Sequence, residues 1–151
     1  MRYFLESSAL TKRFHTEVGS AQVDRIFSER DRIIFVSNLA TIELISVAGI
    51  KQRTGFLTSE GAATFLRQVT ASRRLKEFEV QQMTNEDYKI ASRLLLAYSA
   101  HHSLRTLDAL HLASAVRHRT KSHLEFFVTS DHTLAKVAAL ENFAVKIPEE
   151  S

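Results

Sequence analysis

Short runs of β-forming residues alternate with longer helix-forming segments along the whole chain, and few residues interrupt them. One proline and four glycines stand among 151 residues, so the sequence predicts long helices joined by short turns. Runs rich in β-branched and aromatic residues predict strands at residues 2–5, 32–36, 78–81, 124–129 and 143–147. Helical spacing of apolar residues and capping residues predict helices at residues 8–15, 19–30, 38–53, 58–74, 84–100, 106–119 and 131–141.

This order of elements predicts an α/β fold. Strands that alternate with helices form a parallel sheet whose faces are both covered, because each crossover is right-handed and needs a helix. We therefore expect a three-layer α/β/α domain with a central parallel sheet of about four to five strands. The length suits a single domain that spans residues 1–151.

The composition excludes several kinds of site. The chain has no cysteine, so disulfides, zinc–thiolate centres and cysteine nucleophiles are ruled out. No apolar run approaches the roughly 18–20 residues that span a bilayer, and the charged Glu6 follows the first residues too soon for a signal peptide. We expect a cytoplasmic protein without a membrane partner.

The positive charge of the chain is modest and locally clustered. The formal net charge of +3 is compatible with a polyanionic partner. Basic residues gather at 12–13, 73–76 and 117–121. We interpret these clusters as solvated helix ends, because cations suit the C-terminal end of a helix dipole.

Four carboxylates fall where the predicted sheet would bind a ligand. Ligands of parallel sheets bind beyond the carboxyl ends of the strands. Glu6 directly follows the first strand, and Asp131 follows the strand at 124–129. Asp108 lies in the first turn of the helix at 106–119, and Glu43 lies on the helix that follows the second strand.

Each of these acids also has a purely structural interpretation. Asp131 is equally expected as a helix cap, Asp108 as an anion at a helix N-terminus, and Glu6 as an exposed acid at a strand end. Glu43 differs, because its helix is apolar on almost every face and should bury it in part. A buried carboxylate is normally paired or bound to a metal.

A divalent cation is the expected partner of these acids. Carboxylates that gather without a cation in the surrounding motifs would repel one another and raise their pKa values. Mg²⁺ or Mn²⁺ would remove that conflict, since hard cations prefer oxygen ligands. Such a cation can activate water for phosphodiester hydrolysis. The sequence thus predicts that Glu6, Glu43, Asp108 and Asp131 are both metal ligands and catalytic residues.

Four motifs resemble those of the PIN-domain family, in the family's order and over nearly the whole chain. Residues 4–12, FLESSALTK, resemble the opening of the family, and Ile42-Glu43 resembles its mid-chain glutamate. Residues 105–113, RTLDALHLA, and 127–134, FVTSDHTL, match the third and fourth acid motifs. The resemblance is greatest to the VapC-type toxins of toxin–antitoxin pairs. It implies a Mg²⁺- or Mn²⁺-dependent endoribonuclease for structured RNA such as tRNA, dimeric and neutralised by a cognate antitoxin.

Position 6 departs from the family's pattern. The family usually has aspartate there, and Glu6 is longer by one methylene. Metal sites are sensitive to shifts of that order, so Glu6→Asp is expected to speed cleavage, more in Mg²⁺ than in Mn²⁺. The alternative function is a weakened or inactive PIN-like module that binds RNA or an antitoxin.

Other residues near these motifs are candidates for binding the substrate. They are Ser8, Arg105 and Thr129. Ser8 is equally expected to cap its helix or to contact a metal ligand, and Arg105 to contact a phosphate or lie on the surface. His111 has apolar neighbours and is expected to be a packed core histidine.

Two other α/β classes with acids at strand ends do not fit. A phosphoacceptor receiver domain needs an acidic pair after the first strand. A phosphatase with an aspartate nucleophile needs two aspartates that bracket one residue there. This chain has Glu6-Ser7-Ser8 at that place.

Overall fold

Five parallel strands form one central sheet in the computed structural model, which describes residues 1–150 apart from the side chain of Thr120. The strands are β1 (Arg2–Leu5), β2 (Ile33–Ser37), β3 (Glu79–Gln81), β4 (Phe126–Val128) and β5 (Ala144–Lys146). Their order is β3-β2-β1-β4-β5, and every pair of neighbours is parallel. The predicted α/β class and strand number are confirmed.

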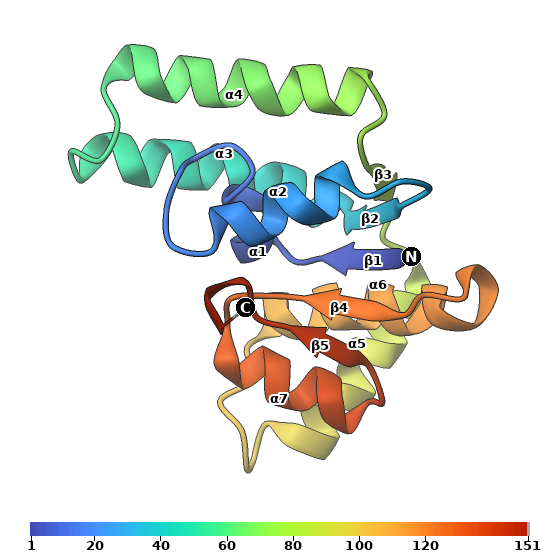
Figure 1. Cartoon of the computed structure of the whole chain (residues 1–151). Coiled ribbons are helices and arrows are strands. Elements are labelled where there is room, and N and C mark those ends of the chain that lie inside the picture. Colours follow the sequence, from blue (N-terminus) through green and yellow to red (C-terminus); the bar gives the residue numbers. More distant parts are fainter. Residues whose placement is uncertain (151) are drawn as a thin grey trace.

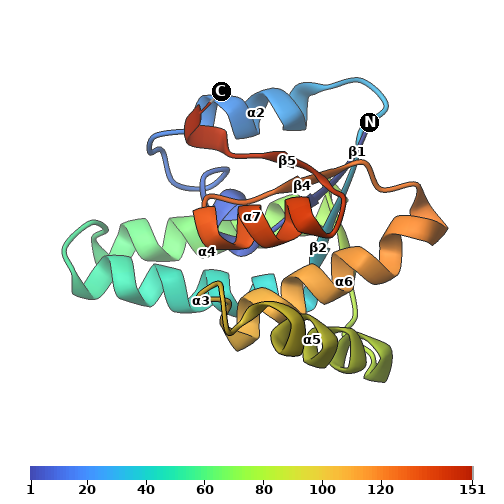
Figure 2. The same cartoon turned by 90° about the horizontal axis from the view of Figure 1, so that it is seen from below.

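Helices cover both faces of this sheet (Figure 1). They are α1 (Ser7–Thr11), α2 (Ser20–Ser28), α3 (Asn38–Arg53), α4 (Ser59–Arg74), α5 (Asn85–Tyr98), α6 (Thr106–Ser122) and α7 (His132–Leu140). A 3-10 turn, η1 (Pro148–Glu150), follows β5. Figure 2 shows the molecule from below, with α5 beside α6.

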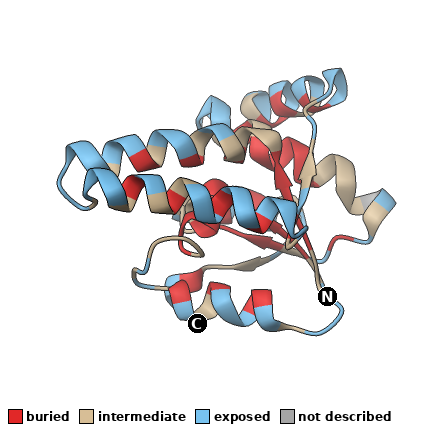
Figure 3. Cartoon of the chain, turned by 90° about the horizontal axis from the view of Figure 1, so that it is seen from above, coloured by how far each residue is buried: buried red, intermediate tan, exposed pale blue. Residues whose placement is uncertain are grey.

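Alternate residues of the strands supply two separate cores. Tyr3 and Leu5 of β1 pack with α1, α2, α3 and α4, whereas Phe4 packs with α5, α6 and α7. This follows from the period of two in a strand, which sends neighbouring side chains to opposite faces. Figure 3 shows buried residues along the strands and on the inner sides of the helices.

The first helix is shorter than expected, and the C-terminal turn was not predicted. The helix expected at 8–15 ends at Thr11. The chain then turns back to Gly19, whose φ of 89° is in the left-handed region that favours glycine. A Cβ at Gly19 would lie 2.9 Å from the Cβ of Pro148, so η1 packs directly against this turn.

The interpretation of the basic clusters as solvated helix ends is wrong for two residues. Lys12 is buried, and its Nζ lies 2.9 Å from Glu17 Oε1 and 2.7 Å from Glu149 Oε1. Arg117 Nε lies 2.7 Å from the fully buried Asp87. Buried cations need such partners, so these residues join elements of the fold and are not free to bind a polyanion.

The topology defines one place where a ligand is expected. The connections run from β1 to β2 and β3 on one side of the sheet, and from β4 to β5 on the other. The order reverses between β1 and β4, and ligands bind at the carboxyl ends of strands at such a switch point. Within residues 1–150, no helix has the length and hydropathy needed to cross a membrane.

Candidate functional site

Glu6 lies at the switch point in a polar cage. It directly follows β1 and is the N-cap of α1. Its buried carboxylate accepts hydrogen bonds from Ser8 N at 3.0 Å and Thr129 Oγ1 at 3.0 Å. The hydroxyls of Ser7 and Ser8 also donate to it. Hydrogen bonds to the ionised form offset much of the cost of burying a carboxylate.

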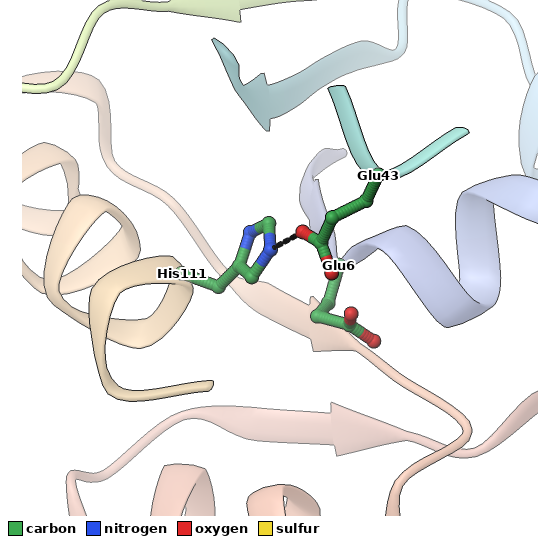
Figure 4. A group of neighbouring side chains, drawn as sticks. All are labelled: Glu6, Glu43 and His111. Carbon is green, nitrogen blue, oxygen red and sulfur yellow. Dashed lines mark hydrogen bonds and ion pairs between the residues drawn. The ribbon is translucent and has the colours of Figure 1, made fainter. Parts of the chain in front are cut away.

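Glu43 reaches the same place from α3. Its Oε2 lies 3.1 Å from Ser7 Oγ, so the Ser7 hydroxyl contacts both Glu6 and Glu43. Its Oε1 contacts Nε2 of the fully buried His111 on α6, and the two groups face each other beside Glu6 in Figure 4. Burial raises the pKa of Glu43, but the partners His111, Ser7 and Arg105 outweigh burial and hold it below the usual range.

Asp108 and Asp131 both accept a backbone hydrogen bond at the start of a helix, and both contact Arg105. Asp108 closes the first turn of α6 by accepting from the backbone N–H of Arg105 at 3.3 Å. Asp131 caps α7 by accepting from the backbone N–H of Leu134 at 2.8 Å. The Arg105 guanidinium also lies 3.1 Å from Asp108 and 3.5 Å from Asp131. Asp131 is therefore a helix cap, as the structural interpretation predicted, and it also lies at the site.

All four predicted acids thus converge, and a cation of the chain faces them. The charge of Arg105 acts on Glu6, Asp108 and Asp131, and it also lowers the pKa of Glu43. The expectation that the motifs supply no balancing cation is wrong, because Arg105 does so from an exposed position. Even so, the pKa of Asp108 is raised, first by its burial and then by the charge of Asp131.

The donor set fits a divalent cation. One ligand atom each from Glu6, Glu43 and His111 lies within 4.8 Å of the others. Carboxylate oxygens suit Mg²⁺ and Mn²⁺, and an imidazole nitrogen suits transition metals. His111 is a fully buried core histidine, as expected, and it also contacts Glu43. Its place near the acids could have been predicted from the sequence, because it follows Asp108 by three residues and so shares a helix face with it.

The predicted substrate-binding residues divide into two kinds. Thr129 and Ser8 contact Glu6 through their hydroxyls, and Ser8 Oγ also accepts from Ser130 N at 2.9 Å. Arg105 is 76% exposed and therefore accessible to a ligand. It borders a surface depression lined by Glu43, Arg105, Thr106, Leu107 and Asp108.

A parallel sheet with carboxylates gathered at its switch point is the architecture of a PIN domain. The PIN domain family model matches residues 3–140. The chain therefore belongs to the PIN domain family, which is a family of nucleases. No curated protein matches the chain.

Solved structures with the same fold include toxins and toxin–antitoxin complexes. VapC20 of Mycobacterium tuberculosis, described as a toxin that cleaves the sarcin–ricin loop, has a TM-score of 0.64 and 14% identity and covers 94% of this chain and 96% of its own. VapBC2 of Rickettsia felis, bound to a promoter DNA fragment, has a TM-score of 0.62 and 13% identity, with 97% and 98% coverage. A toxin–antitoxin complex of Klebsiella pneumoniae has a TM-score of 0.61 and 18% identity, with 97% coverage of both chains.

The charges around Asp108 predict how its pKa responds to substitution. Because Arg105 lowers the pKa of Asp108 and Asp131 raises it, Arg105→Ala should raise that pKa further, and Asp131→Asn should lower it. Carboxyl ¹³C NMR titration of the metal-free protein measures both changes. Arg93→Ala, which removes the ion pair between Arg93 and Glu141, is the control and should leave the Asp108 pKa unchanged. Equal pKa values in all four proteins would contradict the described geometry.

Proposed function

We propose that this protein is a Mg²⁺- or Mn²⁺-dependent endoribonuclease, a VapC-type toxin that cleaves structured RNA such as tRNA and is neutralised by a cognate antitoxin. The observation that carries the proposal is the convergence of Glu6, Glu43, Asp108 and Asp131 at the switch point of a PIN fold. Four carboxylates in one place suit a hard cation better than any neutral ligand.

The residues of the site would have separate roles in metal binding and substrate binding. Glu6, Glu43, Asp108 and Asp131 would hold the metal, with Ser8 and Thr129 orienting Glu6. When bound, the cation would supply activation of water and neutralisation of charge at the phosphate. Arg105 is already drawn to negative charge at the site and would be free to contact an RNA phosphate once a cation replaced it.

Two observations support a structured RNA as the substrate. The fold likeness to VapC20, whose described activity is cleavage of the sarcin–ricin loop, supports an RNA substrate with defined structure. The exposed cation Arg105 at the rim of the acidic site supports a phosphate-bearing ligand. The alternative is a weakened or inactive module that binds RNA or an antitoxin, and it rests on Glu6 in place of aspartate.

Asp108→Asn should remove most of the cleavage while leaving the fold intact. The amide keeps the shape of the side chain but removes the charge that a hard cation needs, so cleavage of a tRNA pool in Mg²⁺ should fall by about a hundredfold or more. The control is Glu86→Gln, an exposed first-turn carboxylate of α5, which should cleave at the parent rate. A fully active Asp108→Asn protein at saturating Mg²⁺ would refute the proposed site.

Glu6→Asp separates the proposal from the alternative. The resemblance favours a faster Glu6→Asp protein, but the four donors around the Glu6 carboxylate support a site built around glutamate. Withdrawing the carboxylate by about 1 Å from these donors should slow single-turnover cleavage, by up to about a hundredfold. Rates are compared in Mg²⁺ and in Mn²⁺. A Glu6→Asp protein that is faster, above all in Mg²⁺, would favour the weakened module.

We also propose that the protein forms a homodimer and binds an antitoxin beside the site. Ile42 and Ile45 flank Glu43 on α3 and are 63% and 60% exposed. Apolar surface of this kind marks interaction sites. Next to it is a groove lined by Thr41, Ile45, Leu66, Val69, Thr70 and Arg73. The toxin–antitoxin complexes among the similar structures support such a partner.

Charges on this surface should break the assembly. The parent protein should scatter light with twice the mass of one chain at micromolar concentration, and tagged parent should recover a small protein from its native host. Ile42→Glu combined with Ile45→Glu should lose at least one of these interactions, because a charge buried in an interface is costly. Leu96→Glu, on the exposed face of α5, is the control. A monomeric parent that recovers no small partner would count against both proposals.

A further inference from the structure

We infer that His111 is a positioning residue of the carboxylate site, which holds the Glu43 carboxylate toward Glu6 while Ser37 fixes the imidazole. The inference rests on the proposed function, because positioning Glu43 matters only if the carboxylates form a functional site. The contacts that support the inference do not depend on a metal. Three elements supply the residues: the end of β2, helix α3, which directly follows β2, and helix α6, which lies more than fifty residues further along the chain.

Glu43 differs from the other three acids in how it is held. Glu6, Asp108 and Asp131 each accept a hydrogen bond from a backbone N–H at the start of a helix. Glu43 lies inside α3 and accepts no backbone N–H among the described residues. Its side chain has several rotatable bonds and loses rotamer freedom when it is fixed. The orientation of Glu43 therefore depends on Ser7 and His111.

His111 is well placed to fix it. The imidazole is fully buried and contacts Glu43 Oε1 through Nε2. Its Nδ1 lies 2.9 Å from Oγ of Ser37, which is also fully buried and ends β2. A ring held at both nitrogens has one orientation, and it transmits the rigidity of the sheet to a side chain on a partly exposed helix.

The donor and acceptor roles follow from the partners. An ionised carboxylate only accepts hydrogen bonds, so the imidazole must present Nε2–H to Glu43. In the neutral ring Nδ1 is then an acceptor, and the Ser37 hydroxyl can donate to it. In the metal-free protein this tautomer directs a proton, not a lone pair, at Glu43, so His111 acts on the site through Glu43.

Two substitutions at His111 separate its two contacts. The amide nitrogen of glutamine can reach the place of Nε2 and donate to Glu43, whereas the amide of asparagine reaches only the place of Nδ1, where its oxygen can accept from Ser37. His111→Gln should therefore keep the hydrogen bond to Glu43, and His111→Asn should keep only the contact with Ser37. Both bury an amide in place of an imidazole, so each serves as the folding control for the other in thermal unfolding.

Binding of Mn²⁺ alone, measured by calorimetry without RNA, should distinguish the variants. His111→Gln should bind within a few-fold of the parent, and His111→Asn should bind about 10–100-fold more weakly, as expected on loss of a hydrogen bond to a ligand. Equal affinities of the two variants would overturn the inference. So would pulsed EPR of the Mn²⁺-loaded parent that reports a directly coordinated imidazole nitrogen.

A metal-free readout keeps the inference apart from the proposed function. In EDTA, ¹⁵N NMR of the parent should find the His111 proton on Nε2, and the Glu43 carboxyl ¹³C signal should shift in His111→Asn but much less in His111→Gln. A proton on Nδ1 with none on Nε2, or equal Glu43 shifts in both variants, would overturn the inference. A parent that meets both expectations yet binds no Mn²⁺ would refute the proposed function and leave His111 as the positioning residue of Glu43.

Discussion

Mutual repulsion of four carboxylates is the constraint on which the site depends. Each acid is held by a different element, and together they raise the energy of the folded chain unless positive charge or hydrogen-bond donors compensate. The chain compensates in two ways. Hydroxyl and backbone donors surround Glu6, and the guanidinium of Arg105 lies between Asp108 and Asp131. The Asp108 pKa remains above its usual value, first because of burial and then because of the charge of Asp131.

The carboxylates of the site also complete the N-terminal ends of the helices around it. Glu6, Asp108 and Asp131 cap α1, α6 and α7, so each carboxylate satisfies backbone N–H groups that would otherwise lack partners. The positive ends of three helix dipoles are thereby directed at one negatively charged region. The same carboxylate side chains therefore stabilise the helix ends and form the site.

The sequence predicted local features well and distant contacts poorly. Strand and helix order, and the placement of the four acids, follow from periodicity and capping that lie within a few residues. The burial of Lys12, just past the end of α1, could not be predicted locally, because one of its partners is Glu149, more than a hundred residues away. His111 was underrated for the same reason, since its apolar neighbours on α6 were visible but its partners Ser37 and Glu43 were not. Arg105 was recognised as a candidate, but its contact with Asp131 required the fold.

The central position of β1 has a consequence for how the protein is made. β1 pairs with β2 on one side and with β4 on the other, where Phe4 lies opposite Phe127. Thr129, a donor to Glu6, is 123 residues further along the chain. At roughly 5–20 residues per second, a ribosome takes on the order of ten seconds to make that stretch. This long-range pairing forms only after β4 has been made, and non-local pairing of this kind slows folding. Until β4 has been synthesised, the nascent chain carries Glu6 without its complete shell, so interrupted translation yields fragments in which the carboxylate centre is unassembled.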